Sequence, residues 1–307
     1  MKYSYFAVLP AVLALSAAVP APALAWGNFA HTEIGEIAWN LLTQKARTEV
    51  ERLLASSHDS LTKNDFPHRA TWADQQRLAT HGATEAWHFV NTPYNSAPTD
   101  EREIEARIES VCHRQVLRIP AASDAAPTNE CVVAKIDEFE KDLAAPSTPA
   151  DEKVLALFFL EHFIGDVSQP LHAISNDDAG GNCVTVSYGR KTTKLHSYWD
   201  DQAAFDAARG FNSIKNGDAL TASVTKEDIR QWYGGTADQW AADSYRVAVS
   251  AVYKDLTPGP LPTCANENVV PIQLSDVYRV RAAETARRQV IKAGIRLAYA
   301  INSTLGK

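Results

Sequence analysis

Apolar residues recur at helical spacing through most of the chain, and one stretch is apolar on nearly every face. Residues 154–160 read Val-Leu-Ala-Leu-Phe-Phe-Leu, which predicts a helix that is buried on all sides. The helix continues through Glu161, His162 and Asp166, and Pro170 ends or kinks it. Since His162 and Asp166 are four residues apart, their side chains point from one helical face.

The polar residues of this stretch suit a metal ion. Charged side chains are rarely buried without a partner or a metal. His162, Asp166 and His172, which follows the turn at Pro170, would bring two imidazoles and a carboxylate together, and this donor set suits zinc. The alternative is a buried His–Asp hydrogen bond beside an unrelated histidine.

The remaining pattern is also largely helical. Apolar residues between Ile34 and Leu42 recur with helical spacing and predict a first helix that starts near His31. Further helices are expected over 69–77, over two parts of 98–145 joined by a loop at 120–128, directly after 195–200, and over 226–254 and 274–303. Residues 184–188 and 191–195 predict a hairpin that turns at Gly189-Arg190.

Strand signals are few, so the sequence predicts a mainly α fold. We expect a single-domain helical bundle over residues 26–307, with a small β-hairpin. The sequence contains neither a low-complexity linker nor an internal repeat that would favour two domains.

Residues 1–25 are expected to form a removable secretory signal peptide. An apolar, alanine-rich core runs from Phe6 to Val19, and Ala23-Leu24-Ala25 is a small-x-small cleavage site. A membrane anchor is the alternative, but the apolar run is short and is broken by Pro10 and Pro20. The mature protein would begin at Trp26 and would be secreted or periplasmic.

The charge balance excludes a global attraction to phosphate backbones or anionic membranes. The formal net charge is −7, and removal of the signal peptide with its single charged residue, Lys2, leaves −8 (−7 minus the +1 of Lys2). A phosphate substrate must therefore be attracted by a local positive site.

Four cysteines in an exported chain predict two disulfides. They allow three connectivities, and we favour Cys112 with Cys131 and Cys183 with Cys264, because the first pair is local in sequence. The alternative, a zinc site built from all four thiolates, lacks the C-x-x-C spacing that such sites show.

Six motifs resemble those of one family and occur in its order. They are Trp-Gly-x-x-x-His from Trp26, Trp-Ala-Asp-x-x-Arg from Trp72, His-Phe-Val-Asn-Thr-Pro from His88, His-x-x-x-Asp-x-x-x-Pro-Leu-His from His162, Gly-Gly-Asn from Gly180 and Leu-His-Ser-x-Trp-Asp from Leu195. Together they resemble the S1/P1 nuclease family of zinc-dependent, secreted phosphodiesterases. The last hundred residues resemble this family only in their helical character.

The resemblance implies a cleft with three zinc ions. The first ion would be bound by Asp74, His88, His162 and Asp166, and the second by His172, His196 and Asp200. The third would be held by the amino group and carbonyl of Trp26, by His31, and by Asp166 as a bridge. Three Zn²⁺ and three aspartates give the site a formal charge of about +3, which would attract a phosphodiester to an acidic protein. Two close metals can activate water and stabilise the attacking and leaving oxygens.

The resemblance also implies contacts with the substrate. Arg77 matches an arginine that contacts the scissile phosphate, and together with Asp74 and Asp166 it is a candidate catalytic residue; the alternative is a surface ion pair. Phe89 matches an aromatic residue that stacks on a nucleobase; the alternative is core packing. Asn91 stands where the fungal members carry an aspartate that accepts hydrogen bonds from a base.

Gly181 and Asn182 match a base or backbone contact, for which a plain turn is the alternative. The activity implied by the resemblance is cleavage of single-stranded DNA and RNA, with low sequence specificity, to 5′-phosphorylated products. It includes removal of 3′-phosphates from nucleotides. We expect the protein to act as a monomer without an obligate protein partner.

Two other functions compete with this hypothesis. A zinc-dependent phospholipase C is similar in its three-zinc design, but its last ligand pair usually reads His-x-x-x-Glu, whereas this chain has His196 and Asp200. An exported, non-enzymatic metal-binding helical protein would have to account for eight side chains at ligand spacing that serve no reaction.

Overall fold

The computed structural model describes residues 26–95, 100–112, 131–209 and 218–306. The predicted signal peptide lies outside these residues. The longer helices are α1 (Asn28–Leu41), α2 (Gln44–Ser56), α4 (Trp72–Ala79), α5 (Glu101–Cys112), α6 (Val132–Ala144), α7 (Ala150–Ser168), α12 (Ala237–Val247) and α13 (Asp276–Leu305). Shorter helical segments are α3 (Phe66–Arg69), η1 (Glu85–His88), η2 (Pro170–His172), α8 (Leu195–Ser197), η3 (Tyr198–Ala203), α9 (Ala204–Arg209), α10 (Asp218–Thr221), α11 (Lys226–Trp232) and η4 (Ala248–Tyr253).

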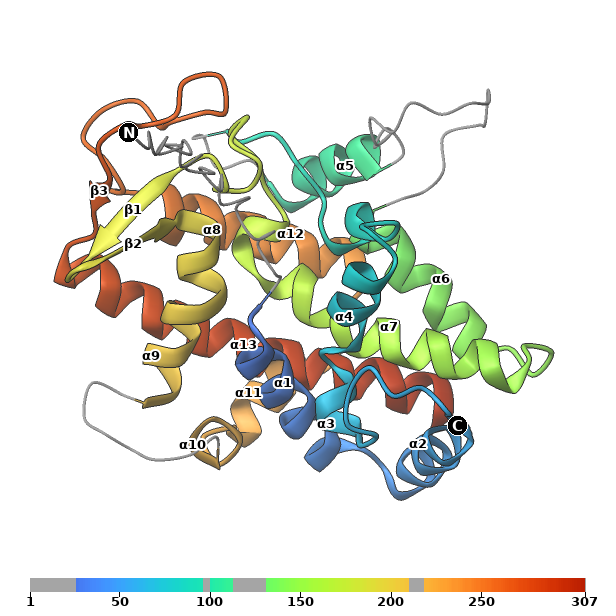
Figure 1. Ribbon diagram of the computed structural model, residues 1–307. Helices are drawn as coiled ribbons and strands as arrows, with labels where there is room; N and C mark the ends of the chain where they lie inside the picture. Colours follow the sequence, from blue (N-terminus) through green and yellow to red (C-terminus); the bar gives the residue numbers. More distant parts are fainter. Residues whose placement is uncertain (1–25, 96–99, 113–130, 210–217, 307) are drawn as a thin grey trace, which may run out of the picture.

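The apolar helix predicted from the sequence is α7, and it lies at the centre of the fold. Its residues from Ala156 to Ser168 are all buried. Figure 1 shows α7 and the long α13 side by side through the middle of the molecule, with α6 on the other side of α7. The helix ends at Ser168, two residues before Pro170, because proline cannot supply the N–H that a continuing helix requires. The mainly α class is confirmed.

A small sheet lies at one end of the helical body. The predicted hairpin is confirmed: β1 (Thr185–Tyr188) pairs antiparallel with β2 (Lys191–Lys194). A third short strand, β3 (Ile272–Gln273), joins β1 in parallel and was not predicted. Both favoured disulfides are present, Cys112–Cys131 and Cys183–Cys264. The second one joins the segment before β1 to the segment before β3.

Two helix boundaries differ from the prediction. The single helix expected over 226–254 is wrong, because Gly234 and Gly235 take positive φ angles of 150° and 92° and separate α11 from α12. Thr225 and Thr236 each begin a helix with a capping box. The helix expected over 69–77 is divided between α3 and α4, whereas α13 matches the predicted 274–303 closely. No helix in the described ranges is both long and apolar enough to cross a bilayer.

Candidate metal centre

Eight buried histidine and aspartate side chains meet beside the carboxyl end of α7. They come from seven elements far apart in sequence: His31 from α1, Asp74 from α4, His88 from η1, His162 and Asp166 from α7, His172 from η2, His196 from α8 and Asp200 from η3. Each is at most 7% exposed. They form three groups whose candidate ligand atoms lie within 4.8 Å of one another: a first group of Asp74, His88 and His162, a second of His172, His196 and Asp200, and a third of His31, His162 and Asp166.

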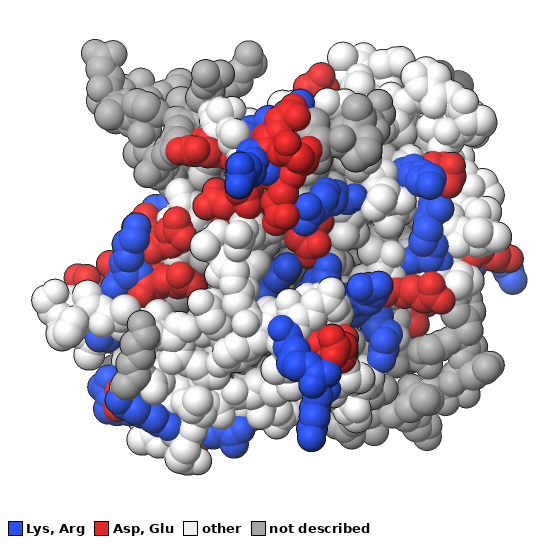
Figure 2. Space-filling view, turned by 180° about the vertical axis from the view of Figure 1, so that it is seen from behind, with Lys and Arg blue, Asp and Glu red and all other residues white. Residues whose placement is uncertain are grey.

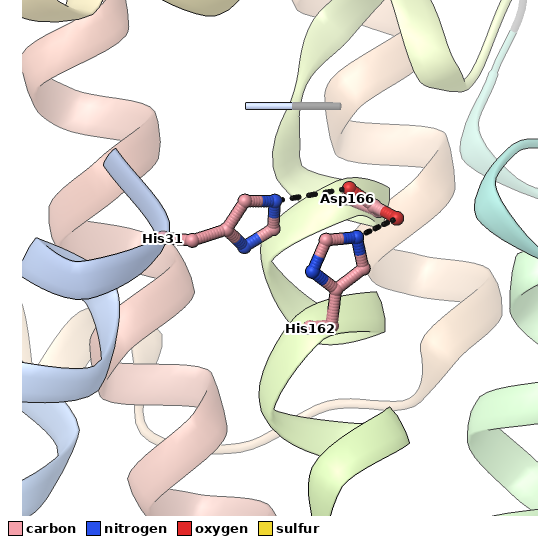
Figure 3. Close-up of side chains that lie close together, drawn as sticks. All are labelled: His31, His162 and Asp166. Atoms are coloured by element: carbon pink, nitrogen blue, oxygen red, sulfur yellow. Dashed lines mark ion pairs between the residues drawn. The ribbon is translucent and has the colours of Figure 1, made fainter. Parts of the chain in front are cut away.

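Asp166 lies between the groups and contacts four histidines. Its Oδ2 is 2.9 Å from Nδ1 of His88 and 3.1 Å from Nε2 of His162. Its Oδ1 is 3.4 Å from Nε2 of His31 and 3.8 Å from Nδ1 of His172. Figure 3 shows His31 of α1 and His162 of α7 converging on this carboxylate from two helices. The central position agrees with the bridging role that the resemblance implies.

His31 fits between α1 and α7 because residue 165 is a glycine. The His31 ring stacks on the His162 ring, with centroids 3.9 Å apart and planes inclined by 14°. A Cβ on Gly165 would lie 2.8 Å from two atoms of the His31 ring. Glycine is unfavourable inside a helix, so this residue is explained by the close approach of the His31 ring.

Backbone carbonyl groups orient three of the imidazoles. The Nδ1 atoms of His162, His172 and His196 lie 2.7, 2.7 and 2.6 Å from the carbonyl oxygens of Ala70, His88 and Gly180. A carbonyl oxygen can only accept, so each Nδ1 carries a hydrogen, and Nε2 is the nitrogen left to face a metal. His88 is reversed, since its Nδ1 faces His162 and Asp166.

Burial keeps most of these histidines neutral. Desolvation lowers the pKa of His31 to about 4, of His172 to about 3 and of His196 to about 4. Burial also opposes protonation of His162, but the carboxylates of Asp166 and Asp74 raise its pKa to about 9. Neutral imidazoles are the form that binds metal.

Several potential ligand atoms lack hydrogen-bond partners among the described residues. They are Nδ1 and Nε2 of His31, Nε2 of His172, Oδ1 of Asp166 and Oδ2 of Asp200. Most buried polar atoms in proteins are hydrogen-bonded, and an unsatisfied one costs about 1–3 kcal/mol. Cations placed among these atoms would satisfy them, so the donor set fits metal ions.

The segment at Trp26 is attached to the third group. Trp26 is fully buried, and the Gly27 N–H donates to the carbonyl of Asp200 at 3.0 Å. The His31 N–H donates in turn to the Gly27 carbonyl at 3.2 Å. The backbone of Trp26 is therefore near both His31 and Asp200, while its role as a ligand stays a prediction.

Arg77 lies inside the centre rather than on the surface. It is 6% exposed, and its Nη2 is 3.3 Å from Oδ1 of Asp74. Asp74 and Arg77 are three residues apart on α4, so they point from one face of that helix. This placement is incompatible with the alternative of an exposed ion pair.

The other predicted substrate residues lie around the centre. Phe89 is half-buried and makes no ring–ring contact with the described residues, unlike the aromatic side chains that pack on the core. The Val132 N–H donates to the carbonyl oxygen of Phe89 at 3.2 Å. Asn91 is also half-buried. These observations favour a free aromatic face at Phe89 over ordinary core packing.

The Gly-Gly-Asn loop supports the centre through its backbone. Gly180 and Gly181 take positive φ angles of 60° and 84°, and the Gly180 carbonyl accepts the hydrogen bond from His196. The Asn182 side chain donates to the Ala179 carbonyl at 2.9 Å and closes its own turn. Gly181 and Asn182 were predicted to contact substrate, whereas the role of Gly180 was not predicted. Its only sequence signal was its place in the motif.

Comparisons with known proteins agree with this geometry. The sequence model of the S1/P1 Nuclease family matches residues 26–306. Nuclease S1 of Aspergillus oryzae is 27% identical over 311 residues, which cover 94% of this chain and 96% of the relative. Nuclease P1 of Penicillium citrinum is 26% identical and covers 92% and 98%. Endonuclease 2 of Arabidopsis thaliana is 26% identical and covers 92% and 91%. The match includes the last hundred residues, where the motifs gave no specific resemblance.

Proposed function

Because the chain belongs to the S1/P1 nuclease family, we propose that it is a zinc-dependent endonuclease acting on single-stranded DNA and RNA. It cleaves with low sequence specificity to 5′-phosphorylated products and also removes 3′-phosphates from nucleotides. The observation that carries this proposal is the meeting of three groups of buried ligand atoms around Asp166.

Three zinc ions are held by these groups. Asp74, His88, His162 and Asp166 hold the first, His172, His196 and Asp200 the second, and His31, Asp166 and the backbone of Trp26 the third. When bound, the ions supply Lewis acidity and lower the pKa of water that attacks phosphorus. A terminal amine at Trp26 requires removal of residues 1–25, so we also propose that the protein is exported and processed.

The side chains around the centre hold and orient the substrate. Arg77 donates to a non-bridging oxygen of the scissile phosphate, and its contact with Asp74 fixes the direction of the guanidinium. Phe89 offers a ring on which any base can stack, which suits low sequence specificity. Asn91, with an amide that both donates and accepts, contacts a base edge. The Gly181-Asn182 turn contacts the base or the nucleotide backbone.

The positive charge that bound zinc ions give this centre would attract a polyanion to a chain that is acidic as a whole. Figure 2 shows Asp and Glu gathered with interspersed Lys and Arg on the rear face, rather than one continuous positive surface. On the face shown there is therefore no continuous positive surface for a polyanion, and we assign its attraction to the centre. We expect the affinity for oligonucleotides to fall sharply when zinc is removed, even in protein that stays folded.

One assay separates this function from its closest competitor. Mature protein with zinc is offered single-stranded DNA, RNA, 3′-AMP and phosphatidylcholine side by side. The proposal predicts hydrolysis of the two nucleic acids and of 3′-AMP, with phosphatidylcholine left intact. Hydrolysis of phosphatidylcholine alone would replace the proposal with a phospholipase C. Turnover of none of the four substrates by zinc-loaded, folded protein would remove the enzymatic assignment.

A further inference from the structure

Gln169 lies where three of the candidate ligands are connected. It is fully buried and directly follows α7. Its backbone N–H donates to the carbonyl of Asp166 at 2.9 Å, and its carbonyl accepts from the His172 N–H at 3.0 Å. Its side-chain Nε2 donates to Oδ1 of Asp200 at 2.7 Å. One residue thus joins Asp166 to the second group.

The orientation of the Gln169 amide is fixed by its other contact. Oε1 accepts from the backbone N–H of Leu171 at 2.6 Å, and a backbone N–H can only donate. The amide oxygen must therefore face Leu171, and the NH₂ group must face Asp200. With Oδ1 engaged by Gln169, Oδ2 of Asp200 lies 3.4 Å from Nε2 of His196. Oδ2 has no hydrogen-bond partner among the described residues.

We propose that Gln169 is a positioning residue of the metal centre, which fixes the Asp200 carboxylate so that Oδ2 alone faces the histidines of the second group. This inference rests on the metal centre proposed above. Asp200 lies in the π-helical segment η3, and the bond from Gln169 connects it to the residue that directly follows α7. A carboxylate held by one oxygen binds a metal through the other, and loss of such a partner typically weakens metal affinity about 10–100-fold.

Gln169→Glu removes the donor while keeping the size of the side chain. One glutamate oxygen can still accept from Leu171, but the other would meet Oδ1 of Asp200 without a hydrogen between them. Gln169→Met removes the donor without adding charge. The matched control is Gln289→Glu, because Gln289 is 1% exposed and its Nε2 donates to the Ser168 carbonyl at 2.8 Å. Gln289 therefore lies at the same helix end without contacting a candidate ligand.

The first measurement is zinc retained per chain during dialysis against chelator-buffered zinc, with circular dichroism and melting curves as the test of folding. Both Gln169 variants should bind one ion about 10–100-fold more weakly than the wild type, and the other ions should be retained. The visible absorption spectrum of the cobalt-substituted protein should change for the same single site. Gln289→Glu should lose stability without selective loss of one ion.

A charge-preserving exchange tests the hydrogen bond itself. In the double variant Gln169→Glu with Asp200→Asn, the new amide can donate to the new carboxylate and keep its own oxygen toward the second group. The double variant should bind the ion that the Gln169 variants hold weakly more tightly than Asp200→Asn alone does. Gln289→Glu combined with Asp200→Asn should show no such gain.

The outcomes separate the inference from the proposed function. Wild-type protein that retains no zinc would overturn the metal centre and this inference with it. Wild-type protein with its zinc, but with uniform ion loss in the Gln169 and Gln289 variants, would show that Gln169 is merely structural. Failure of the exchange to improve on Asp200→Asn would likewise overturn the positioning role and leave the metal centre intact.

Discussion

Asp166 contacts candidate ligands of all three groups: His31 and His162, His88, and His172. Burial raises its pKa, yet the neighbouring His162 and the other histidines hold that pKa well below its usual range. Its charge therefore persists at all ordinary pH values and lies between groups that would each hold a dication. Asp166→Asn keeps the shape but removes that charge. We expect lower zinc content and loss of nuclease activity with helix content retained, and full zinc with near-normal turnover would contradict the bridging role.

Arg77 is predicted to act on substrate rather than on metal. Arg77→Ala should reduce kcat about 100-fold or more, because loss of one donor to the transition state typically costs 10²–10³-fold. Zinc content should not change. Arg47→Ala is the control, since Arg47 lies on α2 and donates to the carbonyl of Trp39 in α1 rather than to a candidate ligand. Loss of zinc from the Arg77 variant would reassign this residue to the support of Asp74.

The individual candidate ligands were predictable from sequence, but the groups that orient them were not. His162 and Asp166 are recognisable from their four-residue spacing in an apolar helix, and His31 from its motif. The carbonyl groups of Ala70 and Gly180 carry no side-chain signal, because any residue supplies a carbonyl. Their positions depend on how distant segments pack, which only the folded structure shows.

The sequence pattern predicted those helices and strands whose formation depends on residues close together in the chain. The apolar run 154–160 predicted α7, because a helix that is apolar on every face must be buried. The division between α11 and α12 was missed, because helical periodicity continues across it and the break depends on the backbone of Gly234 and Gly235. The partner strand β3 was missed as well, since a two-residue strand has no periodicity of its own.

The crossing of α1 and α7 gives a prediction about helix packing. Alanine is intrinsically the better helix former by about 1 kcal/mol, so Gly165→Ala should stabilise α7 if nothing lies against it. The His31 ring lies there, with Ile34 next to it at 3.3 Å. We therefore expect a net destabilisation of about 1–3 kcal/mol, measured by denaturant unfolding, with displacement of His31 and weaker binding of one ion. A more stable variant with full zinc would contradict this packing.

At the scale of the whole molecule, the acidic residues are unevenly distributed. A cleft of about 790 Å³ between α5, α6 and α12 is lined by carboxylates, with Arg102 and Lys141 as the cations among its lining residues. Its carboxylates are Glu105, Glu109, Asp137, Glu138, Asp142 and Asp238. Burial raises the pKa of Asp137, and burial together with Asp137 raises the pKa of Glu140. Part of the charge of α5 and α6 is therefore withdrawn from solvent.

This cleft predicts a pH dependence of stability. A carboxyl whose pKa is raised by folding holds more protons in the folded state, so its contribution to stability falls as pH rises above its unfolded value of 3.8. Asp137→Asn should therefore melt at a higher temperature than the wild type near pH 7. The difference should shrink toward about pH 4, where the wild-type carboxyl is protonated. Equal melting temperatures at both pH values would contradict the raised pKa.

Nuclease activity is proposed to depend on metal ions held by buried groups from seven elements. The most direct test is a zinc titration of chelator-treated mature protein, followed by metal analysis and hydrolysis of single-stranded DNA in the same samples. We expect negligible hydrolysis without zinc and full recovery only as zinc approaches one ion for each of the three groups. Full hydrolysis by protein shown to be metal-free, or saturation with zinc and no hydrolysis, would contradict it.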